Sequence, residues 1–322
     1  MLTKNPGSIP IIERTTMRLI TVSICLLISS GSLVAQSQKK TPWGDPDLQG
    51  IWSTQTPVPL ERPQALAGKA TFSAAEAAEF EKTSLERLLK GLDAAGQVAV
   101  SGELNDTWLE TGSGRVPPNR STSLVTTPAD GKIPYTPEGK KRWDSVPKLE
   151  GLLAANAPED RAESERCLTT SGLYIPNPFY NNLHQIFQTQ GYVVILTEMM
   201  HEVRVVPLDG RAHVGQSVGQ WLGDSRGRWE GQTLVIETTN FNDKRLFRGA
   251  TRNLRLVERL TRLDADTIGY QLEVTDPATF ATPWTLQNAL RKTNGPLYEV
   301  ACHEGNYGLA GILSGARAEE RK

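Results

Sequence analysis

The sequence is poor in histidine, cysteine and aromatic residues: among 322 residues it has four histidines, three cysteines and 7% aromatic residues. It also lacks an excess of charge, because its formal net charge is −1. Proteins that bind nucleic acids present a basic face to the phosphates, so this balance speaks against such a partner. No apolar run reaches the roughly 20 residues of a membrane-spanning helix, so we expect no membrane span in the mature chain.

The longest apolar run is short and lies near the N-terminus, at Leu19–Leu27. Arg18 precedes it, and small residues follow it up to Ala35. This order is typical of a cleaved secretory signal peptide that begins at Met17, and an uncleaved anchor is the alternative. We therefore predict a periplasmic or secreted protein without residues 1–35. The removed residues include three basic and one acidic side chain, which changes the net charge from −1 to −3.

Two cysteines remain after this removal, Cys167 and Cys302. In an oxidising compartment two such cysteines are most simply a disulfide, and two buried free thiols are the alternative. The bond would close a long loop, which the chain-entropy model values at about 5 kcal/mol.

The first half of the mature chain predicts an extended arm followed by helices. Residues 36–70 are rich in proline and lack helical periodicity, so we expect an arm that packs across the main body. The capping box Ser73-Ala74-Ala75-Glu76 predicts a helix from Ala74 to about Lys90. Further helices are predicted after Thr136, where Pro137 takes the first position, and over Pro158–Cys167.

Strand and turn patterns dominate from about residue 182. A short strand, Ser123–Thr127, precedes them. The others are predicted at His184–Thr189, Tyr192–Met200, Glu202–Pro207, Thr233–Thr239, Leu254–Leu263, Thr267–Thr275, Trp284–Lys292 and Tyr298–His303.

Short strands joined by short turns indicate a mainly β fold, an antiparallel meander. It closes most easily as an up-and-down, lipocalin-like barrel, with a sandwich as the alternative. We expect arm and helical segments over 36–180, the barrel over 181–308 and a C-terminal helix over 309–322.

Candidate catalytic residues gather in two stretches of this β region. The first contains Glu198, His201 and Arg204. A histidine and a carboxylate in a partly dry cavity can act as acid and base, and Arg204 could bind an anion.

The second stretch is Cys302–Gly308, which contains His303, Glu304, Asn306 and Tyr307. It follows a predicted strand end, where side chains can converge on a barrel mouth. A turn held by a disulfide is the structural alternative.

A metal site is a further possibility. His201, His213 and His303, with a carboxylate, could hold a divalent ion such as zinc. No two of them share a spacing such as His-x-x-x-His, so folding alone would have to assemble the site. No other cofactor is predicted.

The polar run Gly223–Gly231 is expected to form a hairpin in which an arginine binds a carboxylate. In the functional alternative, Trp229 serves as a stacking platform for a bound ligand. Trp221, Trp229 and Trp284 could line a cavity, although tryptophans more often belong to the core.

Three stretches resemble a family of exported bacterial proteins. They are Pro42–Trp52, Gly223–Gly231 and Ala301–Tyr307 with the following Ser314–Arg317, and the likeness extends over nearly all of the mature chain. The resemblance implies export and one coherent architecture. It implies no activity, so no catalytic residue is carried over from it.

Three functions fit these patterns. The first is an exported enzyme, such as a hydrolase or lyase, that uses Glu198, His201, His303 and Glu304 on a small polar or aromatic molecule, for example a glycoside. The second is a non-catalytic periplasmic barrel that binds a small ligand. The third is an envelope scaffold protein whose arm docks a partner. The sequence does not decide the oligomeric state.

Overall fold

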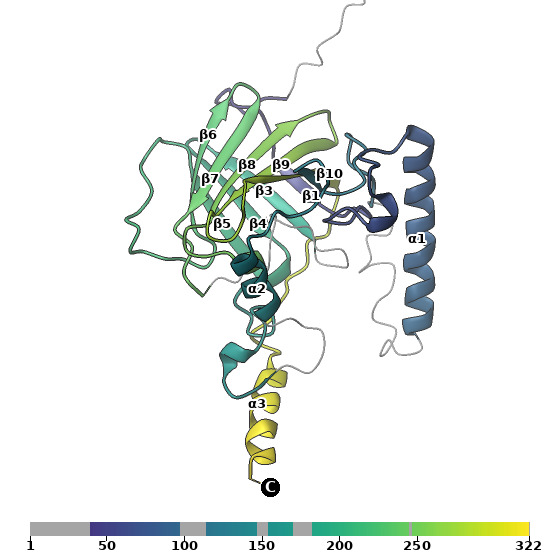
Figure 1. The fold of residues 1–322 in the computed structure, drawn as a ribbon. Helices are drawn as coiled ribbons and strands as arrows, with labels where there is room; N and C mark the ends of the chain where they lie inside the picture. The colour runs from purple at the N-terminus through teal and green to yellow at the C-terminus, as the bar shows by residue number, and fades with distance from the viewer. Residues whose placement is uncertain (1–38, 97–113, 147–153, 170–181, 245–246, 322) are drawn as a thin grey trace, which may run out of the picture. The chain divides into compact units, whose positions relative to one another are not determined.

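The computed structural model of the chain describes residues 39–96, 114–146, 154–169, 182–244 and 247–321 (Figure 1). Its centre is a single antiparallel sheet, in which nine strands follow the order β5-β4-β3-β1-β10-β9-β8-β7-β6 and β2 pairs with β10 at the side. The strands are β1 (Gly50–Ser53), β2 (Val125–Thr127), β3 (Leu183–Thr189), β4 (Tyr192–Thr197), β5 (Glu202–Pro207), β6 (Asp224–Glu230), β7 (Thr233–Thr239), β8 (Arg255–Arg262), β9 (Thr267–Thr275) and β10 (Trp284–Thr293).

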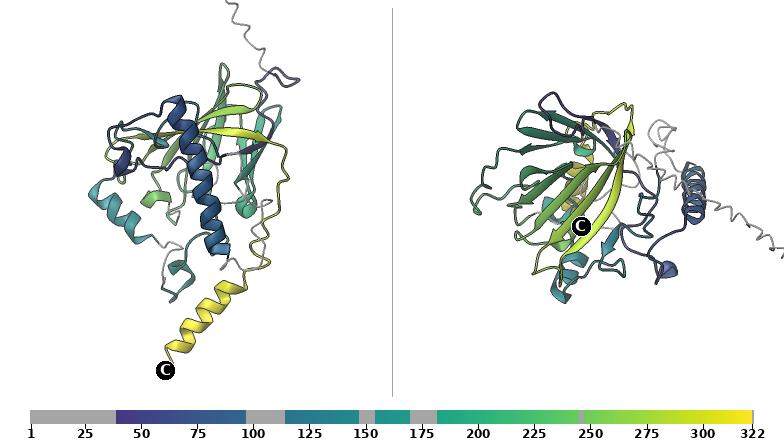
Figure 2. Two further views of the ribbon diagram at one scale, coloured as in Figure 1. Left: turned by 90° about the vertical axis from the view of Figure 1, so that its right-hand side faces the viewer. Right: turned by 90° about the horizontal axis from the view of Figure 1, so that it is seen from above.

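In the described part of the chain, three α-helices and four short 3-10 turns accompany the sheet, and Figure 2 shows them from two further sides. The α-helices are α1 (Ala74–Gly96), α2 (Pro137–Ser145) and α3 (Tyr307–Glu319). The 3-10 turns are η1 (Gln64–Leu66), η3 (Pro158–Asp160), η4 (Met199–His201) and η5 (Phe247–Gly249). Among the described residues, no helix is both long enough and apolar enough to cross a membrane.

Alternation along the strands sets the inside of the sheet. On β9 the side chains of Ile268, Tyr270, Leu272 and Val274 are buried, and the residues between them are more exposed. Successive side chains of a strand point to opposite faces, so these four share the inner face. The corresponding residues of the other strands join them in one apolar cluster.

The sheet curls into a nearly closed barrel. Because nine antiparallel strands are an odd number, the first and last strands, β5 and β6, run in the same direction and cannot continue the antiparallel ladder. Side chains meet across this seam instead. A Cβ on Gly227 of β6 would lie 2.5 Å from Leu208 Cδ2 and 2.8 Å from Val206 Cγ1, so these side chains would have to shift to admit any larger residue.

One end of the barrel, which we call the turn end, carries the tight β3–β4, β6–β7 and β8–β9 turns. The N-terminal arm covers it. The Gln188 side chain donates to the Pro46 carbonyl oxygen at 3.0 Å, and Arg262 donates to the Asp47 carbonyl oxygen at 2.7 Å. Leu48 is fully buried there, and the Trp52 indole donates to its carbonyl oxygen at 3.0 Å. The arm therefore packs on the body as expected, and its last residues form β1 inside the sheet.

The predicted antiparallel β-barrel is confirmed, as are α1, α2, α3 and eight of the nine predicted strands. The up-and-down order is broken at one place, since β1 stands between β3 and β10. Neither β1 nor β6 was among the predicted strands. All described residues belong to one compact unit, Ser37–Lys322.

Two local predictions are wrong. Of the helix predicted over Pro158–Cys167, only the 3-10 turn Pro158–Asp160 forms, and Cys167 has a left-handed φ of 54° that a helix cannot continue. Tyr298–His303 is not a strand: it joins none of the ladders formed by the described residues, and the Tyr298 N–H donates to a Glu198 side-chain oxygen.

Candidate functional site

The end of the barrel opposite the turn end carries the β4–β5, β7–β8 and β9–β10 connections, and we call it the loop end. A line of aromatic rings lies there. Phe280 packs against Tyr135 with ring centroids 5.5 Å apart, and against Trp284 edge-on at 5.7 Å. Pairing of the backbone on both sides of Tyr135 with residues 279–281 fixes the first contact.

Arg248 joins these rings from the β7–β8 connection. Its guanidinium lies over the Trp143 ring of α2, 4.8 Å from the ring centroid. The next residue, Gly249, makes this possible, because a Cβ at that position would lie 2.7 Å from the Trp143 backbone nitrogen. We call Tyr135, Trp143, Arg248, Phe280 and Trp284 the aromatic–arginine cluster.

Hydrogen bonds fasten the connections that carry the cluster. The buried Asp276 accepts from the Thr251 N–H at 2.6 Å and from the Thr279 hydroxyl at 2.8 Å, which ties the β7–β8 and β9–β10 connections together. Arg142 of α2 donates to the Gly249 carbonyl oxygen at 3.1 Å and to the Thr279 hydroxyl at 2.8 Å. The cluster therefore stands on a fixed frame, although its residues come from four separate segments.

Polar groups in the cluster lack the partners that buried groups normally have. The Trp284 indole nitrogen and the Tyr135 hydroxyl are buried and form no hydrogen bond of normal geometry in the described structure. The Arg248 guanidinium lies close enough to donate to the hydroxyl oxygen, so what the hydroxyl lacks is an acceptor for its own proton. Both unpaired groups can donate a proton, so an oxygen acceptor would satisfy them.

Burial also sets the protonation states at the cluster. It raises the pKa of Tyr135 to about 12, so the hydroxyl remains a donor at neutral pH. Burial lowers the pKa of Arg248, but a guanidinium starts so high that it stays a cation. Glu61 acts on both groups through its charge, and its Oε1 accepts from the Ile133 N–H at 2.8 Å.

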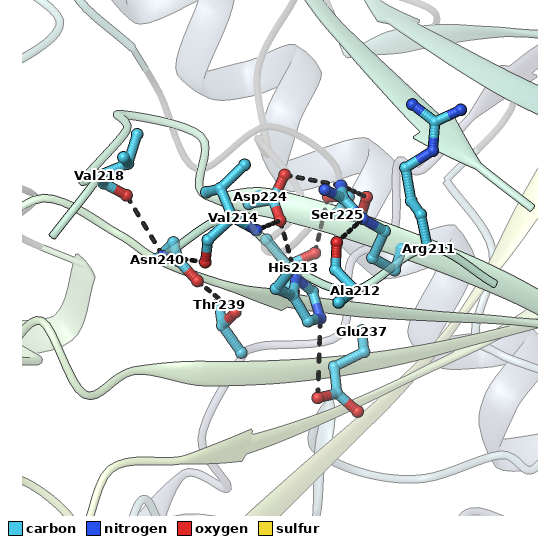
Figure 3. A network of polar contacts seen from close by, with 12 residues as sticks. Arg211, Ala212, His213, Val214, Val218, Asp224, Ser225, Glu237, Thr239 and Asn240 are labelled. Atoms are coloured by element: carbon cyan, nitrogen blue, oxygen red, sulfur yellow. Dashed lines mark hydrogen bonds and ion pairs between the residues drawn. The ribbon is translucent and has the colours of Figure 1, made fainter. Parts of the chain in front are cut away.

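A second polar network lies on the outer wall, where the segment 208–223 returns from the end of β5 to the start of β6 (Figure 3). His213 Nδ1 lies 2.9 Å from Asp224 Oδ2, and its Nε2 lies 3.8 Å from Glu237 Oε1. The Asn240 side chain donates to the carbonyl oxygens of Val214, Gly215 and Val218. The network fixes the returning segment against β6 and β7, which gives His213 a structural role.

Residues 223–227 have the pattern Gly-x-Ser-x-Gly, which in hydrolases places a serine on a sharp strand-to-helix turn. Here Ser225 lies within β6, is buried, and shares a hydrogen bond of 2.8 Å with the Thr238 hydroxyl. The structural context of a nucleophile is therefore missing. The predicted binding of an arginine to a carboxylate is confirmed, since Arg226 contacts Asp224 at 2.6 Å.

Glu198 of the first candidate stretch is buried and holds backbone groups. Its two carboxylate oxygens accept from the N–H groups of Tyr298 at 2.8 Å and of Leu183 at 3.3 Å. His201, three residues later, is exposed and has a left-handed φ of 55°. Within the described residues, no hydrogen bond or ion pair joins their side chains.

The second candidate stretch lies outside the barrel interior. His303 and Glu304 are exposed, and Tyr307 is 82% exposed. Asn306 caps α3, since its side chain accepts from the Leu309 N–H at 3.3 Å and donates to the Glu165 carbonyl oxygen at 2.8 Å. Acid–base catalysis by Glu198, His201, His303 and Glu304 stays a prediction, and these positions give it no support.

Arg204 and Trp229 do point into the barrel. The Arg204 guanidinium binds Glu258 through two contacts, of 2.5 and 2.9 Å, so its anion belongs to the chain itself. Trp229 packs against the apolar cluster, and its indole nitrogen is buried without an acceptor among the described residues.

The histidine of the barrel interior, His184, was not among the candidates. Its ring nitrogens lie 3.1 Å from the Thr197 hydroxyl and 3.4 Å from the Thr54 hydroxyl. Burial, and after it the charge of Arg204, lowers the pKa of His184 to about 3, so the ring is neutral. The described residues contain no group of three acidic, histidine or cysteine side chains placed to hold a metal, so His201, His213 and His303 do not form one ligand set there.

The predicted disulfide is confirmed: Cys167 and Cys302 are bonded, with their Cα atoms 5.7 Å apart. The bond joins the segment before α3 to the turns that follow η3. Asn306 also donates to Cys167 Sγ at 3.3 Å, which supports the same junction.

The chain matches no protein-family model, and no curated protein matches it. Among solved structures it is similar to a secretary abundant heat soluble (SAHS) protein from Ramazzottius varieornatus, at 11% sequence identity and a TM-score of 0.24. The match covers 34% of this chain and 70% of that one. A likeness this distant bears on neither fold nor function, so the functional argument depends on the cluster's own geometry.

Proposed function

We propose that this chain is an exported barrel that binds a small molecule at the aromatic–arginine cluster. The observation that supports it is the gathering of three groups at one place: the Tyr135 hydroxyl and the Trp284 indole nitrogen, which lack an acceptor, and the Arg248 cation, which has no carboxylate partner among the described residues. An unpaired buried donor costs about 1–3 kcal/mol, so a ligand that supplies acceptors would gain from meeting them.

Binding fits the cluster better than catalysis does. It offers ring faces and donors, and the raised pKa of Tyr135 keeps that group from acting as a base at neutral pH. Export belongs to the same proposal. It depends on the predicted signal peptide, and the disulfide between Cys167 and Cys302 is typical of proteins in oxidising compartments.

The test uses Prodan, a neutral fluorescent naphthyl ketone whose oxygen is an acceptor. We expect saturable binding to the full mature protein, with a several-fold weaker Kd in Tyr135→Phe. Because this variant removes only an unpaired hydroxyl, its Tm should equal or exceed that of the wild type.

Tyr192→Phe is the matched control. The Tyr192 hydroxyl lies on the outer wall and accepts from Arg211 at 3.0 Å, so Prodan binding should not change. Equal binding by wild type and Tyr135→Phe, or no saturable binding at all, would contradict the proposal.

A further inference from the structure

Arg248 differs from the partly buried arginines that form ion pairs, and also from Arg62 and Arg262, whose guanidinium groups donate to hydroxyl or carbonyl oxygens. Arg204, Arg226 and Arg161 each have a carboxylate within 2.6 Å. Arg248 has none within ion-pair distance among the described residues, and its close neighbours are the Trp143 ring and Tyr135. A partly desolvated cation without an anion is costly, and binding an anion would relieve that cost.

The shape of a guanidinium narrows the class of anion. One face of Arg248 is turned to the Trp143 ring, so recognition falls to its edge, whose parallel N–H groups match the two oxygens of a carboxylate. The Tyr135 hydroxyl lies beside this guanidinium and needs an acceptor. The donors thus suit one planar group with two oxygens.

The side chains around Arg248 indicate what the rest of the ligand should be. The rings of Tyr135, Phe280 and Trp284 follow one another at 5.5 and 5.7 Å, and Trp143 faces the guanidinium from α2. Aromatic rings pack well in offset or edge-on arrangements against such a row. A flat aromatic body therefore fits beside the carboxylate better than a sugar or an aliphatic chain.

We propose that the aromatic–arginine cluster binds a small aromatic monocarboxylate, with its carboxylate on Arg248 and Tyr135 and its ring against the neighbouring aromatic side chains. This inference rests on the proposed function and names the ligand class for the same site. Glu61 provides a sensitive check on it, since its negative charge acts on both Arg248 and Tyr135 and opposes a bound anion.

The test compares naphthoate with naphthamide, which has nearly the same shape without the charge, by calorimetry on the full mature protein. We expect naphthoate to bind about tenfold more tightly than naphthamide. In Arg248→Gln the two should bind alike. Cyclohexanecarboxylate should bind more weakly than naphthoate, because it lacks the flat ring.

Glu61→Gln is the second variant, and it tests the proposal with Arg248 still in place. The amide oxygen can still accept from the Ile133 N–H, so the fold should hold. Naphthoate should bind several-fold more tightly in this variant, while naphthamide should be unchanged.

Equal affinity of the wild type for naphthoate and naphthamide would overturn the carboxylate assignment, as would a preference that survives in Arg248→Gln. If Prodan still binds in a Tyr135-dependent way in that case, the proposed function stands and only the ligand class fails. If neither Prodan nor the naphthalene derivatives bind, both fail.

Discussion

Arg204 on β5 and Glu258 on β8 form an ion pair inside the barrel. The two residues lie on opposite sides of the seam between β5 and β6. Their contacts of 2.5 and 2.9 Å are supplemented by the Tyr270 hydroxyl, which donates to Glu258 at 3.1 Å. Because β5 and β6 share no ladder, this pair is a polar tie between the two sides of the seam.

Removing one partner of this pair should destabilise the protein strongly. Arg204→Met leaves the fully buried Glu258 without its cation, so we expect the free energy of unfolding to fall by about 3–5 kcal/mol. Urea denaturation measures it. The double variant Arg204→Met, Glu258→Leu should recover part of the loss, and a single variant within about 1 kcal/mol of wild type would show that the pair does not hold the seam.

The seam also predicts the effect of a methyl group at Gly227. Gly227→Ala would push against Leu208 and Val206, at a cost of about 1–3 kcal/mol in the free energy of unfolding. Gly215→Ala is the control, because a Cβ there would meet only Ser217 Oγ, at an ordinary contact distance of 3.9 Å, and its φ is not in the left-handed region. Equal stability of the two variants in urea would mean that β5 and β6 can move apart at the seam without loss of unfolding free energy.

His184 predicts a pH dependence. Its pKa is lowered to about 3 in the folded protein, mainly by burial, and is ordinarily about 6.5 in an unfolded chain. Between these values the unfolded state binds the additional proton. The free energy of unfolding should therefore fall as the pH falls from about 6.5 towards 3, by up to about 1.4 kcal/mol per pH unit from this group.

Urea denaturation of wild type and His184→Gln at several pH values between about 7 and 4 isolates this term. The variant should lose less stability than the wild type over that range, whatever its stability at neutral pH. Parallel curves would show that His184 takes up its proton in the folded state.

Glu198 separates a structural from a catalytic role. Glu198→Ala leaves the N–H groups of Leu183 and Tyr298 without their acceptor, so we expect a loss of about 1–3 kcal/mol in unfolding free energy. Glu198→Gln keeps one carbonyl oxygen and should lie between the two. If both variants are as stable as wild type, the carboxylate is not needed for the fold, which would favour the predicted role of Glu198 in acid–base catalysis.

The hairpins could be predicted from the sequence because their signals are local. The strands β7, β8 and β9 are rich in apolar and β-branched residues and are joined by turns or by a polar connection, so their own residues define them. β1 is four residues long and pairs with β3 and β10, both distant in the sequence, so nothing near it indicated a strand. Tyr298–His303 shows the reverse: strand-like residues without a neighbouring strand to pair with.

The candidate site was out of reach for a similar reason. Tyr135, Trp143 and Arg248 lie far apart in the sequence, and Arg248 reaches the other two only in the folded chain. Trp284 was considered as a cavity residue, but its missing acceptor becomes visible only in three dimensions. The prediction placed the site at residues 198–204 and 302–308 because histidines and carboxylates occur there. In the structure the candidate histidines and carboxylates are exposed or bind backbone groups.

The position of β1 has a consequence for how the chain becomes a barrel. Residues 50–53 are made early, yet one of their two partner strands, β10, ends only at Thr293. A chain that emerges from its N-terminus must therefore carry this strand incompletely paired until nearly all of it has been synthesised. The sheet therefore cannot be completed until β10 has been made, because only then does the first strand have both of its partners.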